Sequence, residues 1–440
     1  MVDSQGKLKR DIGLLTATCI VIGNMIGSGV FVTSGIIAGK LPNATWVMSF
    51  WLAGGVIAIM GSLCYSELAT RMPEEGGEYV YLSKLLHPLF GFLAGWPSLI
   101  VGFSAPIAGS ALGFSEYFFS GINVGDISHL VIIKKCVAIS IVLVFTLIHF
   151  LGVKKGGYVQ NALVLFKVAT ILGIITLGFA LGKPDWKAFL NETTSSSGEI
   201  AMGTALLLIM FSYSGWNASG YIAGEIKNPK RNIPFSLIMG TSVVMLLYLG
   251  LNMLFLSSGG TVKDENSITV FERTASVFFG QYAGQVVSII ISVFLLSSLS
   301  AFIMIGPRVY YAMARDKLFF RFAARLNPRY NVPGRSIVIQ GLLAIFFVAF
   351  SSVEQLLIFL YYALNLFPCL VVIALFVARK KKVGELNAVK VPGYPVTPFL
   401  FLVASVYIAV MAFINSPKES VSAIAMILIG VPCYYLVIKG

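Results

Sequence analysis

Apolar residues dominate this chain in runs of roughly twenty, and short polar segments separate the runs. A run of that length is what an α-helix needs to cross the hydrocarbon layer of a bilayer. The pattern therefore predicts an all-α polytopic membrane protein with 12 transmembrane helices. We place these helices at residues 12–37, 44–70, 86–120, 132–150, 157–181, 201–222, 233–257, 283–314, 335–350, 353–378, 398–414 and 419–438.

The first and the sixth of these runs are interrupted halfway by residues that do not favour a continuous helix. The first contains Gly-Ser-Gly at residues 27–29, and the sixth contains Ser-Gly-Trp-Asn at residues 214–217. An unwound backbone is tolerated inside a bilayer only where it is buried in protein or lines a cavity, because unpaired amides in lipid are costly. The two breaks therefore predict a binding site at mid-membrane.

Each break lies in the first helix of a block of five predicted helices. An odd number of spans makes the second block enter the membrane from the opposite side, so we expect a 5+5 inverted repeat formed by residues 12–181 and 201–378. Helices 1 and 6 are then the helices unwound at mid-membrane. A basic and then Pro/Gly-rich linker, residues 379–397, precedes two additional helices at residues 398–438, and residues 1–11 form the N-terminal segment.

Composition and charge agree with a membrane protein. The chain is 57% hydrophobic and 12% charged, whereas soluble domains carry about 25% charged residues. Of its 32 lysines and arginines, 23 lie in the loops and ends on one side of the predicted spans and 8 on the other. The excess positive charge predicts cytoplasmic N- and C-termini and a cytoplasmic linker. The net charge of +13 thus indicates topology and lipid headgroups rather than nucleic acid as a partner.

The first break offers backbone amides. Gly27 and Gly29 flank Ser28, so the backbone can adopt dihedral angles that leave successive N–H groups free. Free amides at the positive end of a half-helix suit a carboxylate. The alternative is that the two glycines only permit close helix packing.

The second break offers carbonyl groups. Freed carbonyls and the C-terminal end of a half-helix accept hydrogen bonds from a cation, and Phe211, Tyr213 and Trp216 supply walls for a small cavity. An ammonium group and a carboxylate held by opposite helix ends describe a zwitterion, so an amino acid is the ligand that we expect. The alternative is that these aromatic side chains face lipid or the protein core.

Lys167 lies near the centre of the fifth predicted helix. Because a lysine at mid-membrane is costly, its side chain should face the interior of the bundle. Three roles stay open: an ammonium that replaces a bound sodium ion and holds the first helix through its carbonyls, a proton-carrying group, or a purely structural residue.

The remaining acidic residues suggest little. Glu67 and Glu116 lie towards the ends of their predicted spans, and we interpret both as interfacial. No predicted span carries an acid beside the second break, where Asn217 stands. That absence argues against a cationic side chain in the pocket.

Catalytic and metal chemistry lack candidates. The three histidines, His87, His129 and His149, are scattered without ligand spacing, and the sequence contains no nucleophile–base set and no Walker-type loop. We therefore expect no enzyme activity, no cofactor and no metal site. The five cysteines show no motif spacing, and we interpret them as packing residues.

Several motifs resemble the L-type branch of the amino acid-polyamine-organocation transporters. They are residues 23–31 (GNMIGSGVF), 65–68 (YSEL), 73–81 (PEEGGEYVY), 211–217 (FSYSGWN), 225–229 (EIKNP) and 308–316 (RVYYAMARD). The resemblance implies two inverted five-helix repeats plus two extra helices. It also implies sodium-independent exchange of L-amino acids by alternating access.

The resemblance further implies roles for individual residues. The amides that hold the substrate carboxylate fall on Gly27, Ser28 and Gly29, and the carbonyls that take the amino group fall on Met25, Phe211 and Ser214. The aromatic ring that closes over the substrate falls on Phe211, and the pocket wall includes Trp216, Asn217 and Phe302. The residues that steady the unwound helices fall on Lys167 and Tyr248.

Two departures from the family pattern bear on the substrate. Arginine-specific relatives place an acid where Asn217 stands, which favours neutral substrates here. Phe302 occupies a wall position that is small in relatives with large substrates, which favours small side chains such as those of Ala, Ser, Thr or Cys. Proton-coupled symport, with Lys167 titrating, and a nutrient receptor that binds without transport are the alternatives.

The animal members of the family join a glycoprotein heavy subunit through a cysteine between the third and fourth spans. Residues 121–135, the corresponding segment here, contain no cysteine. We therefore expect no covalent heavy subunit and a location in a bacterial inner membrane.

Overall fold

The computed structural model describes residues 8–122, 129–182, 184–186, 198–258, 270–350, 353–415 and 417–439. This part of the chain is helical apart from two isolated β-bridges. The first half contains α1 (Leu14–Met25), α2 (Gly29–Lys40), α3 (Ala44–Arg71), α4 (Glu78–Leu85), α5 (Pro88–Pro97), the π-helical turn η1 (Ser98–Ser104), α6 (Ala105–Gly121), α7 (Leu130–Phe150) and α8 (Val153–Leu181).

The second half begins with two short helices around the second break. It contains α10 (Glu199–Tyr213), α11 (Ala218–Tyr221), the 3₁₀ turn η2 (Ala223–Glu225), α12 (Pro229–Leu256), α13 (Val270–Phe279), α14 (Ala283–Arg315), the 3₁₀ turn η3 (Arg321–Ala324), α15 (Gly334–Phe350), α16 (Val353–Lys380), α17 (Val396–Asn415) and α18 (Pro417–Lys439). Each of the twelve predicted spans coincides with one of these helices or with consecutive helical pieces.

Length and composition make several of these helices able to cross a bilayer. Within the described residues, α3, α7, α8, α12, α14 and α17 are each long and apolar enough, which gives six clear spans. Two bent pairs raise the number to eight: α1 with α2, bent by 43°, and the helical pieces of residues 88–121, bent by 41°. The chain is therefore a polytopic helical membrane protein, as the hydrophobic pattern predicts.

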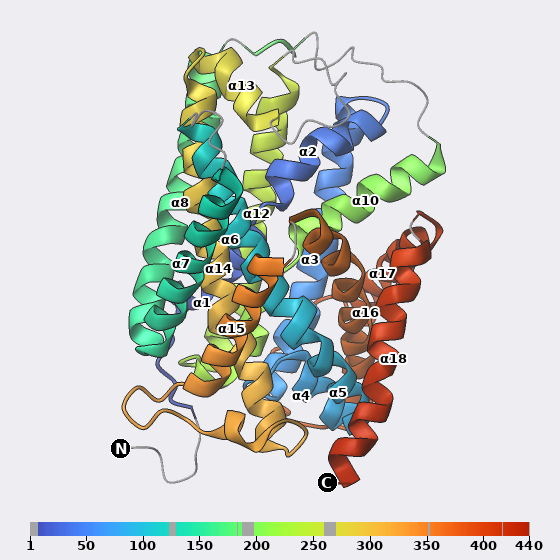
Figure 1. Ribbon diagram of the computed structural model, residues 1–440. Helices are drawn as coiled ribbons and strands as arrows, with labels where there is room; N and C mark the ends of the chain where they lie inside the picture. The colour runs from blue at the N-terminus through green and yellow to red at the C-terminus, as the bar shows by residue number, and fades with distance from the viewer. Residues whose placement is uncertain are drawn as a thin grey trace.

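The bundle is organised around α14, the longest helix in Figure 1. It packs against α1, α6, α7, α8 and α15, and most of its apolar middle is buried. In α7 and α8, by contrast, most of the corresponding window stays exposed on the outside of the protein. Exposed leucine, valine and phenylalanine side chains on these outer helices suit contact with lipid.

Glu67 lies towards the end of α3, as predicted, but its side chain is inside the protein rather than on the surface. Glu67 is fully buried, and its carboxylate accepts hydrogen bonds from the Nε atoms of Arg71 and Arg379, each at 2.9 Å. It also accepts the backbone N–H of Val391 at 2.8 Å. Buried carboxylates require such partners, so Glu67 ties the basic linker and α16 to α3. The sequence analysis missed this role because all partners except Arg71 lie more than 300 residues away.

Glu116 of α6 and Cys136 of α7 both lie on the outer surface of the protein. Glu116 is exposed and pairs with Lys134 at 2.5 Å, which agrees with an interfacial position. Cys19 and Cys64 are buried, as expected for packing residues, whereas Cys136 of α7 is exposed. The packing role predicted for all five cysteines is therefore wrong for Cys136.

Two ion pairs, the first of them buried, join the segments at the end of the molecule where both termini lie (Figure 1). Arg308, near the end of α14, binds Glu225 with a 2.7 Å contact, and both side chains are almost fully buried. Arg315, at the end of the same helix, binds Glu75 at 2.6 Å. Ile12 forms an isolated β-bridge with Ile226: its N–H donates to the carbonyl of Glu225, and its carbonyl accepts the N–H of Lys227. The start of α1 is thus held against the segment that follows the second break.

Candidate functional site

The first break separates α1 from α2. Helix α1 ends at Met25, and α2 begins at Gly29. The N–H of Gly27 donates to the carbonyl of Met25 at 2.9 Å. The N–H groups of Ser28 and Gly29 have no acceptor among the described residues, as expected for the first turn of a helix. These amides lie at the positive end of the α2 dipole.

The second break separates α10, which ends at Tyr213, from α11, which begins at Ala218. Gly215 has a φ of +98°, a region that residues with a Cβ rarely adopt. Its carbonyl accepts the side-chain amide of Asn24, on α1, at 3.3 Å. The carbonyl of Phe211 accepts the N–H of Ser214 at 3.0 Å. Both predicted interruptions are therefore present.

The two breaks lie against each other. The hydroxyls of Thr33 and Ser212 are 2.9 Å apart, and the Tyr248 hydroxyl lies 2.9 Å from the carbonyls of both Met25 and Ser212. A Cβ atom on Gly29 would lie 2.9 Å from the Cα of Ser212. The two breaks are thus adjacent in space, and Tyr248 of α12 bonds to both of them.

Lys167 of α8 forms a hydrogen bond to the backbone of the first break. Its side chain is fully buried, and its Nζ donates to the carbonyl of Ile26 and lies 3.5 Å from the hydroxyl of Ser298. The Ser298 hydroxyl donates to the same carbonyl at 2.9 Å. The Phe294 ring is 5.8 Å from the ammonium. The expectation that Lys167 faces the interior is confirmed, and no carboxylate pairs with it in the described part of the chain.

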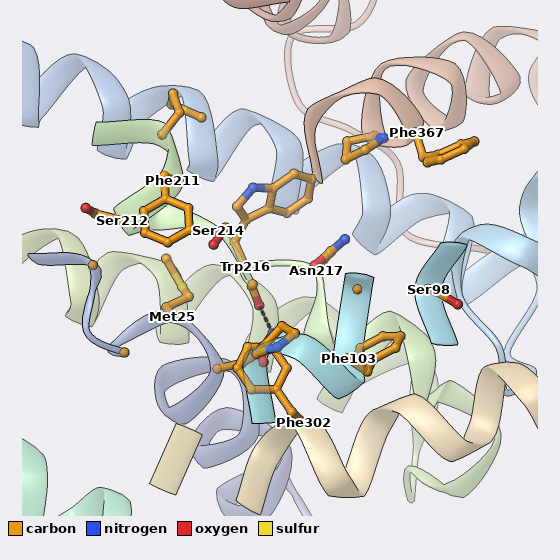
Figure 2. Close-up of a pocket in the computed structure, with 18 of the residues that line it drawn as sticks. Met25, Ser98, Phe103, Phe211, Ser212, Ser214, Trp216, Asn217, Phe302 and Phe367 are labelled. Carbon is orange, nitrogen blue, oxygen red and sulfur yellow. Dashed lines mark hydrogen bonds between the residues drawn. The ribbon is translucent and has the colours of Figure 1, made fainter. Parts of the chain in front are cut away.

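A cavity of about 150 Å³ lies beside the breaks, roughly ten times the space that one water molecule needs. It therefore has room for a small organic molecule. Figure 2 shows the side chains around it, with Phe211 near Met25 and with Asn217 between Trp216 and Ser98. The predicted residues that line it are Met25, Gly27, Ser28, Gly29, Phe211, Ser214, Trp216, Asn217 and Phe302.

Aromatic side chains form part of the cavity wall. Tyr213, which was also predicted to be a wall residue, does not line the cavity, and its hydroxyl donates to the carbonyl of Trp51 at 3.0 Å. The Trp216 ring packs edge-on against Tyr65 at 4.8 Å between centroids, which fixes its orientation. Phe302 of α14 faces Phe103 of η1 at 6.5 Å. The bend at η1 brings Phe103 to this position, a contribution that the hydrophobic pattern of the third span did not reveal.

Glu78 is the most important residue that the sequence analysis missed. It is the first residue of α4, outside the spans, and it lines the cavity. Its carboxylate accepts the hydroxyl of Tyr65 at 2.7 Å and the amide of Asn217 at 3.0 Å. An acid therefore does stand beside the second break, so the argument against a cationic side chain does not hold. The segment between the second and third predicted spans, which contains Glu78, has no periodic pattern from which the direction of this side chain could be predicted.

Burial decides the protonation of this acid. Burial raises the pKa of the Glu78 carboxyl to about 7, although the hydrogen bonds from Tyr65, Tyr221 and Asn217 favour the ionised form. The carboxyl therefore exchanges a proton near neutral pH.

Interrupted helices whose free backbone groups and side chains surround one cavity inside an apolar bundle are characteristic of secondary transporters. The chain belongs to the amino acid permease family, whose profile, described as "Amino acid permease", matches residues 12–437. The L-type resemblance noted above is confirmed by individual relatives, all of which are named as transporters or exchangers.

Three relatives illustrate the similarity. The serine/threonine exchanger SteT of Bacillus subtilis is 30% identical over 434 residues, which cover 97% of each chain. The human b(0,+)-type amino acid transporter 1 is 27% identical over 98% of this chain and 88% of its own. The mouse Asc-type amino acid transporter 1 is 25% identical over 98% of this chain and 81% of its own. The similarity therefore extends along nearly all of this chain.

The contact between the breaks predicts that Gly29→Ala destabilises the protein. The added methyl group meets the backbone of Ser212 at 2.9 Å, and overpacking of this kind costs about 1–3 kcal/mol. Gly173→Ala in α8 is the matched control, because a Cβ there meets nothing within 4 Å and Ala is favoured over Gly inside a helix. The melting temperature of each purified variant in detergent should fall for Gly29→Ala only. Equal melting temperatures would show that the breaks are not in contact.

Proposed function

We propose that this protein is a sodium-independent exchanger of neutral L-amino acids that works by alternating access in the plasma membrane of a bacterium. The observation that carries the proposal is the juxtaposition of the two breaks at one cavity, together with membership in the amino acid permease family. The relatives named above include a serine/threonine exchanger.

The substrate is held by its charged ends. Its carboxylate binds at the amides of the first break, Gly27, Ser28 and Gly29, where the N–H groups of Ser28 and Gly29 have no acceptor among the described residues. Its ammonium group binds the carbonyls of the segment around Met25, Phe211 and Ser214. Because the Met25 carbonyl already has the Gly27 amide and the Tyr248 hydroxyl as donors, one of these bonds yields when the substrate enters.

The side-chain end of the pocket favours small substrates. Phe211 closes over the bound amino acid, and Trp216, Asn217 and Phe302 limit the space for its side chain. We propose Ala, Ser, Thr and Cys as the best neutral substrates.

Alternating access requires helices that move as units. The proposed units are the five-helix repeats of residues 12–181 and 201–378, with helices α17 and α18 outside them and all twelve predicted segments crossing the membrane. The opposite directions of the broken helices support the repeat, since α2 extends away from the termini and α10 runs back towards them in Figure 1. The ion pairs Arg308–Glu225 and Arg315–Glu75 break when the end bearing the termini opens. Both termini lie in the cytoplasm, and no covalent heavy subunit takes part.

Exchange is tested in proteoliposomes. We expect labelled L-serine or L-alanine to enter vesicles loaded with unlabelled amino acid several-fold faster than empty vesicles, with the same rates in sodium and in choline buffer. A twenty-amino-acid competition series then ranks the substrates. Equal uptake into loaded and empty vesicles would exclude exchange, a sodium requirement would exclude the cation-free mechanism, and saturable binding without flux would indicate a receptor.

The hydrogen bonds of Lys167 predict that Lys167→Ala lowers exchange while the protein stays folded. A hydrogen bond to a charged group contributes about 1.5–3 kcal/mol, so the initial rate should fall by about tenfold or more. Lys154→Ala is the matched control, because Lys154 lies on the same helix and is exposed. Size-exclusion chromatography checks folding. Unchanged exchange in Lys167→Ala would assign this lysine a structural role only.

A further inference from the structure

Glu78 is an acid on the wall of the proposed binding cavity that the exchange mechanism above does not use. Its side chain is about nine-tenths buried, with 9% of its surface exposed. The cavity that it lines also borders Ser28 and Gly29 at the first break. A ligand that occupies the whole cavity therefore reaches from the backbone amides to this carboxylate.

The neighbours of Glu78 are arranged to hold a carboxylate. Tyr65 and Asn217 donate to its Oε1 atom at 2.7 and 3.0 Å, and the Tyr221 hydroxyl also bonds to the side chain. A carboxylate accepts about four hydrogen bonds. These three donors leave one position unused, and all three are electrically neutral. The negative charge is thus oriented but not compensated.

The nearby cations are already paired with other acids. In the described part of the chain, no lysine or arginine forms an ion pair with Glu78. On the elements around it, the other cations have acidic partners: Arg308 binds Glu225, Arg315 binds Glu75, Lys84 binds Glu74, and Arg71 and Arg379 bind Glu67. Lys380 is exposed. The remaining titratable neighbours are the phenol groups of Tyr65, Tyr81 and Tyr221, which carry no positive charge.

The cation that completes this site must come from the cavity. We propose that Glu78 is the anionic element of a side-chain subsite that binds the ammonium or guanidinium group of a cationic amino acid such as lysine, ornithine or arginine. The inference rests on the proposed function, because the α-carboxylate of the same substrate is anchored at the first break. The side chain extends along the cavity, and its cation takes the free acceptor position on Glu78. Asn217 donates a hydrogen bond that orients the Glu78 carboxylate, and the acid that binds the cation is Glu78.

The same subsite accommodates neutral substrates. A proton neutralises Glu78 when no side-chain cation is present, because burial raises the pKa of this group to about 7. Proton and side-chain cation then compete for one position. The carboxyl is mostly protonated at pH 6 and mostly ionised at pH 8, so binding of a cationic side chain should strengthen as the pH rises through 7.

The test compares L-lysine with L-norleucine, its neutral analogue of nearly the same length, as inhibitors of the exchange of a labelled neutral amino acid. The wild-type ratio of inhibition constants should shift in favour of lysine by roughly tenfold between pH 6 and pH 8, as expected for one group that titrates at the midpoint. In Glu78→Gln the preference for lysine and its pH dependence should both disappear. Glu78→Asp should keep part of the preference, and Glu116→Gln, an exposed acid on α6, should behave as the wild type.

A second measurement does not depend on transport. L-lysine at pH 8 should raise the melting temperature of the purified wild-type protein more than norleucine does, and this difference should vanish in Glu78→Gln. Loss of exchange with this stabilisation retained would contradict the proposed function but support the subsite. The subsite is excluded if lysine neither competes nor stabilises in the wild type, or if Glu78→Gln weakens lysine and norleucine equally.

Discussion

The backbone groups released by two interrupted helices must find partners inside a bilayer, and this requirement governs the rest of the structure. No water is available in the hydrocarbon layer to bond to a free carbonyl. Lys167 and Ser298 therefore bond to the carbonyl of Ile26, Tyr248 to that of Met25, and Asn24 to that of Gly215. These donors come from α1, α8, α12 and α14, so those four helices must surround the breaks.

The same bonds tie the two breaks to several helices at once. Each released carbonyl is held by side chains from helices other than its own. Gly29 and Gly215 allow the two breaks to approach within van der Waals contact, and Gly27, Ser28 and Gly29 line the cavity. The carbonyl groups at the breaks are thus bonded within the protein, whereas the N–H groups of Ser28 and Gly29 have no acceptor among the described residues.

The hydrophobic pattern predicted the helices well because each span is a long continuous run. The predicted segment 283–314 corresponds to α14 at Ala283–Arg315, and segment 132–150 to α7 at Leu130–Phe150. The glycine-containing breaks were equally predictable, since glycine in the middle of an apolar run is a local signal. The buried position of Lys167 followed from the cost of a charge in lipid. These features depend on residues close together in the sequence.

The features that escaped prediction depend on distant partners. Glu67 lies near the end of its span but is buried by Arg379 and Val391, which come from the linker region. Glu78 lies outside the predicted spans, at the start of α4, and only the three-dimensional arrangement brings it to Asn217. The bend at η1 arises in a predominantly apolar run. Local pattern contains no information about such contacts.

The most direct test of the central claim is whether both charged ends of an amino acid are needed for binding at the paired breaks. The melting temperature of the purified protein should rise with the best-stabilising free L-amino acid. It should rise far less with the methyl ester of that amino acid, which lacks the carboxylate, and with its N-acetyl derivative, which lacks the ammonium group. Equal stabilisation by the parent and by either derivative would contradict a zwitterion held between the two breaks.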